Sequence, residues 1–427
     1  MAKHSDITKR FFLLAKHQEI QALHHLSSNC KIVKAVTDMI HQLQRERGIS
    51  NVFLCSKGER FADQRTQQEK VSQDSEKQLR SLLNSLYLSN ADKGSGIRLV
   101  SAITISLQGM DNLRSLRSKI SSQQVTPSES TNAFCRLIAA LIDVVFEAAD
   151  VANDPTITRL LVVLFNFIQG KEYAGQERAC GAIGFSSESF QKSLCDHITA
   201  LTESQNNTFD TFTKFADATE LNMWQQQQNS EHTQHLIRLR KMICNLDQTS
   251  SCNAALSEIW YDIATLRIDA MREIEEHITD RLIERASQRV TEAEEELRNN
   301  ELLVASLSNT QPIEGAPISM IFDETVKGLS VADSTKAEVV PSTSLSAHKS
   351  FYDLIREQAQ RIQDITNELN CSKQALNEQK IIDRAKLLLM QQGKLSENQA
   401  YKKLQSAAMQ NNVRIADLAK RIVNPTS

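Results

Sequence analysis

The feature that most constrains the fold of this 427-residue chain is the absence of proline between Pro155 and Pro312. Proline breaks helices because it lacks a backbone N–H and clashes with the preceding turn. The chain also has only 12 glycines, and aromatic residues make up 5% of it. Few helix breakers and few strand-forming residues favour long helices over sheets. The sequence therefore predicts an all-α protein.

Hydrophobic periodicity divides the chain into two helical domains and a linker. From Phe11 to about Leu307 it predicts about eight helical segments, with loops at 89–95, 121–130 and 152–155. The periodicity stops between Asn309 and Lys349, where three of the six prolines gather. We expect a long helical-bundle domain at 1–308, a linker at 309–350 and a smaller helical domain at 351–427.

Several common classes of site and segment are not indicated. The eight cysteines form no CxxC pair or His/Cys cluster, as expected for reduced thiols in a cytoplasm without a structural metal. The N-terminus has no signal-peptide pattern. The longest apolar stretch, Leu160–Ile168, is far shorter than the roughly 20 residues of a membrane span. We expect a cytoplasmic protein with no membrane contact, metal or cofactor.

The net charge of −3 conceals an asymmetry along the chain. Residues 380–427 contain nine Lys or Arg and three acidic residues, so this end carries +6 and the remainder −9. A small basic module on an acidic body indicates a polyanionic partner.

The C-terminal domain begins with a heptad pattern. Apolar residues recur every seven positions at Ile355, Ile362, Leu369 and Leu376. Four heptads with a half-polar alternate position predict a short coiled coil and hence a homodimer. The alternative is an amphipathic helix that packs within its own chain. Next we expect a helix ending at Gly393, a second helix and a third from Val413, which together make a small three-helix unit.

A specific motif follows the heptads. It runs Asp383-Arg-Ala-Lys-Leu-Leu-Leu-Met390, then Leu395-Ser-Glu397, Ala400-Tyr401 and Asp417-Leu-Ala419. In order and spacing it resembles ANTAR, the RNA-binding antiterminator domain of bacterial regulators of amide and nitrate metabolism. The resemblance implies binding of paired hairpins in a transcript leader, which prevents terminator formation and so affects the transcribing RNA polymerase indirectly. Leu387 departs from the glycine usual in the family, which a helix interior tolerates.

Seven side chains in this domain are candidates for RNA contact. Ala385, Leu404 and Leu418 lie at spacings that bury a small core, which leaves the basic side chains to contact phosphates and loop bases. The aromatic candidate can either stack on an unpaired base or join the core. The candidates are Arg384, Lys386, Lys402, Lys403, Arg414, Lys420 and Tyr401.

Two arginines of the long domain lie on or beside apolar stripes. Arg47 follows Leu43 by one helical turn, so its guanidinium is expected to point toward the core. A buried arginine needs a partner, ordinarily an internal Glu or Asp. Arg240 falls four residues after Leu236, beside an apolar stripe, whereas Arg238 lies on the polar face.

A third arginine, Arg178, lies between Ala174 and Ala182 in the segment Lys171–Gly181. Small neighbours allow another helix to approach closely. Because this segment repeats the Glu-Arg pair that ends at Arg47, it hints at two similar helical halves.

The segments Gln44–Ser50, Lys171–Gly181 and Leu239–Lys241 resemble the nitrate- and nitrite-sensing module called NIT. The two-domain order resembles antiterminators of the NasR type. The resemblance implies a helical bundle in which Arg47, Arg178 and Arg240 clamp one nitrate or nitrite ion. The chemistry is suitable, because a guanidinium donates paired N–H bonds to a planar oxyanion and keeps its charge when buried.

The predicted function is a one-component antitermination regulator of a nitrate-assimilation operon, in which anion binding controls binding to two-hairpin leader RNA. The sequence leaves open whether the anion relieves inhibition or promotes dimer contacts. No phosphate loop, metal-ligand spacing or nucleophile motif suggests an enzyme, so no catalytic residue is expected. One alternative is a coiled-coil assembly protein with a basic end that binds membrane or DNA. Another keeps the RNA domain but senses a different small oxyanion or a partner protein.

Overall fold

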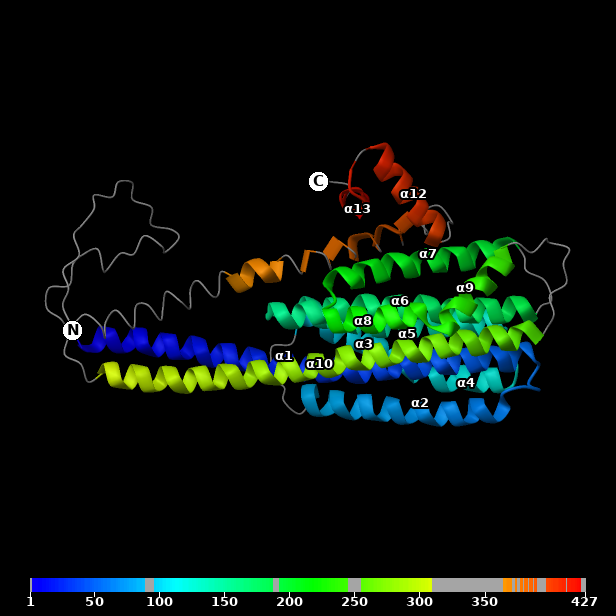
Figure 1. Ribbon diagram of the computed structural model, residues 1–427. Coiled ribbons are helices and arrows are strands. Elements are labelled where there is room, and N and C mark those ends of the chain that lie inside the picture. Colours follow the sequence, from blue (N-terminus) through cyan, green and yellow to red (C-terminus); the bar gives the residue numbers. More distant parts are fainter. Residues whose placement is uncertain are drawn as a thin grey trace. The chain divides into compact units, whose positions relative to one another are not determined.

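The computed structural model describes residues 2–88, 96–186, 192–244, 255–308, 364–370, 373–374, 377–378, 380–382, 384–386, 388–389, 397–411 and 413–423. Every regular element in these ranges is a helix, which confirms the all-α prediction (Figure 1). The chain forms two compact units. One contains residues 1–23 and 288–367, and the other contains residues 24–287 and 368–427.

The first unit contains the start of α1 (Ala2–Cys55) and the end of α10 (Ala255–Ser308). Lys16 is nearly buried and its Nζ lies 2.9 Å from Glu19 Oε2 and 3.4 Å from Glu296 Oε1. Helix α1 begins before the predicted start of the helical region at Phe11 and continues to Cys55.

The second unit contains most of the helices of the long domain. Up to residue 308 the described ranges hold ten α-helices rather than the predicted eight, because short breaks at Asn112 and Ser230 divide helical runs. The remaining helices of this part are α2 (Ala62–Leu83), the π-helix η1 (Asn84–Leu88), α3 (Ile97–Asp111), α4 (Leu113–Ser121), α5 (Pro127–Asp150), α6 (Pro155–Ser186), α7 (Lys192–Phe215), α8 (Ala218–Asn229) and α9 (Glu231–Cys244).

Local sequence signals explain several helix starts. Thr126 Oγ1 accepts a bond from the Glu129 backbone N–H, while Glu129 accepts one from the Thr126 N–H, a capping box that begins α5 with Pro127 in its first turn. The predicted loop at 121–130 is therefore confined to 122–126. The predicted loop at 152–155 ends where α6 begins, whereas 89–95 lies outside the described residues.

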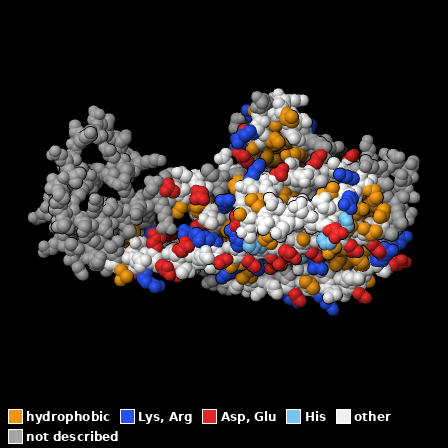
Figure 2. Space-filling view, viewed as in Figure 1, with side chains coloured by type: hydrophobic (Ala, Val, Ile, Leu, Met, Phe, Trp, Pro, Cys, Tyr) orange, Lys and Arg blue, Asp and Glu red, His pale blue; other side chains and the backbone are white. Residues whose placement is uncertain are grey.

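Helix α6 is the central element of the second unit. It packs against α5 and α7 (Figure 1), and most of its described side chains are buried. A helix that is covered on all sides has apolar residues around its whole circumference, as Leu160–Ile168 has apart from Asn166. None of the described helices is both long and apolar enough to cross a membrane. Acidic and basic side chains are instead interspersed along the exposed face of α10 (Figure 2).

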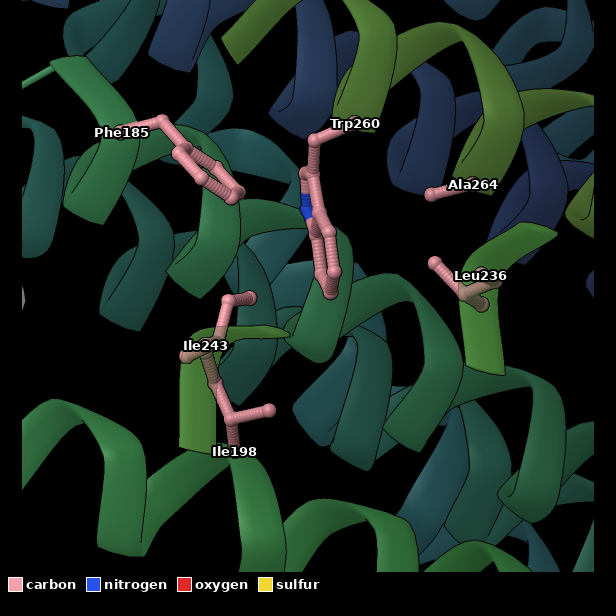
Figure 3. Close-up of a cluster of buried hydrophobic side chains, with 6 residues drawn as sticks. All are labelled: Phe185, Ile198, Leu236, Ile243, Trp260 and Ala264. Carbon is pink, nitrogen blue, oxygen red and sulfur yellow. The ribbon is translucent and has the colours of Figure 1, made fainter. Parts of the chain in front are cut away.

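The close approach of α6 and α10 centres on one glycine. A Cβ at Gly181 would lie 2.1 Å from Trp260 Cε2, so only glycine leaves room for the indole ring. Trp260 Nε1 donates to the Arg178 carbonyl oxygen at 3.1 Å. The ring lies within a cluster of buried apolar side chains (Figure 3). This cluster comprises Phe185, Ile198, Leu236, Ile243, Trp260 and Ala264.

The C-terminal domain contributes α12 (Glu397–Gln410) and α13 (Ile415–Val423), with helical turns from residue 364 onward. Ala385 and Leu404 form its buried centre, as the sequence predicts, together with Ala419, whereas the predicted core residue Leu418 is only partly buried and packs against them. Of the four heptad positions only Leu369 falls among the described residues, and the predicted C-cap Gly393 falls outside them. The linker at 309–350 also lies outside the described residues, so the three domain boundaries stay predictions.

Candidate anion-binding site

Helix α6 carries a layer of buried charge through the second unit. Burying an ion costs several kcal/mol unless a partner of opposite charge lies beside it. Most buried cations of the second unit have a carboxylate partner. The pairs are Arg47–Glu172, Arg117–Glu46, Lys171–Glu275 and Arg240–Glu177.

Arg47 of α1 lies fully buried against α6, as its position on the apolar stripe predicts. Its Nη1 donates to Glu172 Oε1 at 2.5 Å and its Nη2 donates to Glu172 Oε2 at 3.1 Å. Nη1 also contacts Cys135 Sγ at 3.1 Å. Burial opposes the charge, but Glu172 outweighs it and raises the pKa of Arg47 above its ordinary value. Arg47 is thus held as a cation by an internal carboxylate.

Arg178 of α6 is equally buried and has a different environment. Its Nη2 donates to the Gln44 carbonyl oxygen at 2.8 Å and its Nη1 to Thr265 Oγ1 at 3.0 Å. The guanidinium carbon lies 5.2 Å from the ring centre of Tyr261. Among the described residues no carboxylate is hydrogen-bonded to it. Burial lowers the pKa of Arg178, and the charge of Arg47 lowers it further.

Each of the two arginines occupies space that a glycine leaves open in the facing helix. A Cβ at Gly175 of α6 would lie 2.4 Å from Arg47 Nη2, and a Cβ at Gly48 of α1 would lie 2.7 Å from Arg178 Nη2. Each helix therefore supplies one arginine and, close to it in sequence, the glycine that accommodates the arginine of its neighbour. This arrangement brings two guanidinium groups together in the interior.

Both guanidinium groups retain an unused donor. Arg47 Nε and Arg178 Nε are buried and have no hydrogen-bond partner among the described residues. A buried donor left unsatisfied costs about 1–3 kcal/mol. Donors of this kind, together with a buried guanidinium that no carboxylate of the described residues hydrogen-bonds, favour a small anion with several acceptor oxygens.

Arg240 of α9 has a different set of contacts from Arg47 and Arg178. Its Nε donates to Glu177 Oε1 at 2.5 Å and its Nη2 to Glu177 Oε2 at 2.6 Å. The side chain is largely buried, whereas Arg238 is exposed, which confirms the positions predicted for the two. The structure thus brings Arg47 and Arg178 together and places Arg240 with Glu177.

Sequence reasoning missed the carboxylates of this layer and one further arginine. Glu172 and Glu177 lie in the segment Lys171–Gly181, but their partners depend on helix packing. Arg267 of α10 could have been found, because it continues the stripe of Trp260 and Ala264 at helical spacing, three residues after Ala264. It is 4% exposed. No group of three metal-ligating side chains occurs in the ranges that the structure describes.

The C-terminal candidates differ in accessibility. Arg384, Lys403 and Lys420 are exposed, and Tyr401 is partly buried. Arg414 is exposed and its Nε donates to Asp417 Oδ2 at 3.0 Å.

For two of the RNA-contact candidates the structure does not show an exposed side chain. Lys386 is only 8% exposed, because it falls beside the buried Ala385, so the expectation that it lies on the surface was wrong. The side chain of Lys402 is outside the described residues.

Two lysines join the C-terminal segment to α5 within the second unit. Lys380 Nζ lies 2.6 Å from Glu147 Oε1 and 4.2 Å from the ring centre of Phe146. Nearby, Lys373 Nζ donates to the Asp150 carbonyl oxygen. The segment that leads into the basic domain is therefore held on the long domain by two lysines.

A bundle of long helices with an arginine-rich interior, followed by a small basic helical domain, defines a class of ligand-responsive regulator. Two family profiles match the chain: the one described as nitrate and nitrite sensing, at residues 38–283, and the ANTAR domain, at residues 372–423. The chain belongs to the nitrate and nitrite sensing family.

Relatives of known identity share both parts. The chain is 27% identical over 426 residues to the nitrate regulatory protein of Klebsiella oxytoca, covering 99% of this chain and 96% of that protein. A solved structure of the NasR transcription antiterminator matches with a TM-score of 0.59 and 25% identity, covering 96% of this chain and 97% of that one.

Proposed function

We propose that nitrate or nitrite binds between Arg47 and Arg178, and that this event controls binding of the C-terminal domain to leader RNA. The chain is a nitrate-sensing regulator of transcription antitermination, since its two domains follow the order of such regulators along its whole length. The observation that carries the site assignment is the buried guanidinium of Arg178, to which no carboxylate of the described residues is hydrogen-bonded.

The chemistry of the proposed site rests on the two free Nε donors. Nitrate is planar and offers three equivalent oxygens, so one ion can accept N–H bonds from both arginines at once. Its single negative charge balances Arg178, while Glu172 already balances Arg47. Arg240 contributes indirectly, because it forms an ion pair with Glu177, the residue that precedes Arg178 in α6.

The switch we propose begins at Gln44. Its carbonyl oxygen accepts from Arg178 and its Nε2 donates to Glu172 Oε2 at 2.9 Å, so one residue of α1 contacts both halves of the arginine site. An anion that engages both guanidinium groups competes with these contacts and alters how α1 lies against α6. A ligand can shift a conformational equilibrium only through such differential contacts.

The output we propose is release of the C-terminal segment. The contact of Lys380 with Glu147 favours relief of inhibition over promotion of dimer contacts, although the heptads still predict a homodimer. The released domain binds two-hairpin leader RNA in the cytoplasm through Arg384, Lys403, Arg414 and Lys420, with Lys386, Lys402 and Tyr401 as further candidates. RNA polymerase is affected only through the folded transcript.

The test is a gel-shift titration of a two-hairpin leader RNA with the full chain in millimolar nitrate, nitrite or chloride at constant ionic strength. The variants are Arg47→Lys, which retains the charge opposite Glu172 but loses the planar fork, and Arg178→Met, with exposed Arg238→Met as the control. Tryptophan fluorescence during urea unfolding reports folding, because both tryptophans, Trp224 and Trp260, lie in the long domain.

We expect nitrate or nitrite to strengthen RNA binding by the wild type and the Arg238→Met protein, and to have no effect on folded Arg178→Met. Equal RNA binding in all three salts would reject the nitrate site and point to another oxyanion or a partner protein. A nitrate response that survives in Arg178→Met would move the site elsewhere in the bundle.

A further inference from the structure

Arg267 is the second buried arginine that lacks a hydrogen bond to a carboxylate among the described residues. Its Nη1 donates to Gln205 Oε1 at 2.9 Å, and its Nε is buried with no partner. Burial lowers the pKa of Arg267 to about 9, with a further contribution from Arg240. As at Arg178, a cation has been buried without a counter-charge bound to it.

Arg267 belongs to a hydrogen-bonded network that carries a net positive charge. Gln205 Oε1 accepts from both Arg267 and Arg240, the latter at 3.2 Å, and Gln205 Nε2 donates to Glu177 Oε2 at 2.8 Å. These four side chains form one network with two cations and one carboxylate. The network therefore has a charge of +1, and it retains an N–H donor to direct at a ligand.

This network borders a cavity of about 370 Å³ between α7, α8, α9 and α10. Both arginines line the cavity, and so do Phe209 and Trp224, whose ring centres are 4.2 Å apart. The volume falls within the roughly 300–1,000 Å³ of small-molecule sites. It far exceeds the need of a four-atom oxyanion, since a water molecule takes up roughly 30 Å³. The cavity fits an organic body as well as a charged group.

We infer that this cavity binds a small organic monocarboxylate with a flat apolar body, at a site separate from the Arg47–Arg178 pair. The carboxylate accepts from the free Nε of Arg267, and the body lies against the aromatic rings. The exposed Asp210 also lines the cavity and disfavours a second negative charge on the ligand. The site gives the sensor a second input, and it stands independently of the nitrate assignment.

The probe is benzoate, which joins one carboxylate to a flat ring, and benzamide is its uncharged isostere. Each is titrated into the full chain at constant ionic strength while tryptophan fluorescence is followed, because Trp224 forms part of the cavity wall. The variants are Arg267→Met and Thr202→Phe, which fills the cavity without altering either arginine. Arg178→Met serves as the matched control, since it also removes a buried arginine without a carboxylate partner.

We expect a saturable response to benzoate alone, weakened about tenfold or more in Arg267→Met and in Thr202→Phe, and retained in Arg178→Met. Arg267→Met should unfold at the same or higher urea concentration than the wild type, because it removes an uncompensated buried charge. Thr202→Phe keeps the test decisive if Arg267→Met fails to fold.

The inference would be overturned by no saturable response to benzoate, by an equal response to benzamide, or by unchanged benzoate binding in both cavity variants. If nitrate displaces benzoate, and if nitrate binding is lost in Arg267→Met but kept in Arg178→Met, the cavity is the nitrate site itself. That result would reject both assignments. Loss of the nitrate response with retention of benzoate binding would reject the nitrate site alone.

Discussion

At positions 48 and 175 a side chain is absent where an arginine of the facing helix occupies the space. Glycine in a helix interior costs about 1 kcal/mol relative to alanine. Two such positions beside the same pair of arginines therefore indicate that close approach of the guanidinium groups outweighs local helix stability. The two glycines thus explain why Arg47 and Arg178 can lie close together.

Replacing Gly175 with alanine tests this packing. The new Cβ would lie 2.4 Å from Arg47 Nη2, so Arg47 must leave its paired contact with Glu172. We expect the free energy of unfolding to fall by about 1–3 kcal/mol and nitrate affinity, measured by calorimetry, to fall about tenfold. Gly109→Ala is the control, because it crowds only Leu137 in another part of the bundle. Equal nitrate affinity in both variants would contradict the proposed site.

His41 provides a prediction for the dependence of stability on pH. It is 6% exposed, and its Nδ1 lies 3.5 Å from Lys171 Nζ. Burial, followed by the charges of Lys171, Arg272, Arg45 and Arg178, lowers the pKa of His41 well below its ordinary value of 6.5. Below pH 6.5 the unfolded chain therefore binds a proton that the folded chain does not.

The resulting loss of stability on acidification is about 1.4 kcal/mol per pH unit from this residue. We expect His41→Gln to remove that contribution, so its free energy of unfolding should fall less steeply between pH 6.5 and 5 than that of the wild type. Urea unfolding followed by tryptophan fluorescence measures both slopes. Parallel slopes for the two proteins would show that His41 binds its proton as readily in the folded chain as in the unfolded chain.

At the scale of elements, α6 determines the interior because its neighbours approach it closely. Gly181 admits the Trp260 ring of α10, and the same stretch of α6 carries the arginine site. The apolar cluster around Trp260 therefore fixes the distance between α6 and α10 beside Arg178 (Figure 3).

Gly181→Ala should displace Trp260 and loosen this contact. Overpacking a core by one methyl group ordinarily costs about 1–3 kcal/mol, which we expect as a lower midpoint of urea unfolding. The fluorescence of the folded protein should also change, because the indole hydrogen bond to the Arg178 carbonyl is disturbed. An unchanged spectrum and midpoint would mean that α6 and α10 lie farther apart than described.

The sequence predicts helices and their buried faces because periodicity is a local property. It placed Arg47 in the core, and it placed Arg240 beside an apolar stripe with Arg238 exposed. It could not pair Arg47 with Glu172, or reveal that within the described part of the chain Arg178 donates to Thr265 and the Gln44 carbonyl and not to a carboxylate, because those facts depend on the register between helices. The burial of Lys386 was likewise hidden, since a charged residue ordinarily marks an exposed position.

At the scale of the whole molecule, the contact of Lys380 with Glu147 is the one through which we propose that the sensor controls the RNA-binding domain. The pair is partly buried and Lys380 also lies over Phe146. Exposed ion pairs contribute about 0–1 kcal/mol, and a cation–π contact adds about 0.5–1 kcal/mol. An energy of this size can hold the domain in place and still be overcome by a ligand.

Glu147→Gln should therefore increase RNA affinity about two- to fivefold without nitrate and leave affinity in saturating nitrate unchanged. Gel shifts of the full chain measure both quantities. Asp74→Asn is the control, because it removes an exposed carboxylate that pairs with Lys77 on α2. Unchanged affinity without nitrate would favour the alternative route through dimer contacts.

The reciprocal placement of two arginines and two glycines also has a consequence for divergence within the family. Once one arginine is replaced by a smaller residue, the glycine opposite it can be replaced by a residue with a side chain. Replacing the glycine first is disfavoured, because the new side chain would clash with the arginine that it faces. Positions 48 and 178, and likewise 47 and 175, should therefore vary together and in a preferred order. A relative that has lost the arginine of one pair would be recognisable by a larger residue at the partner position.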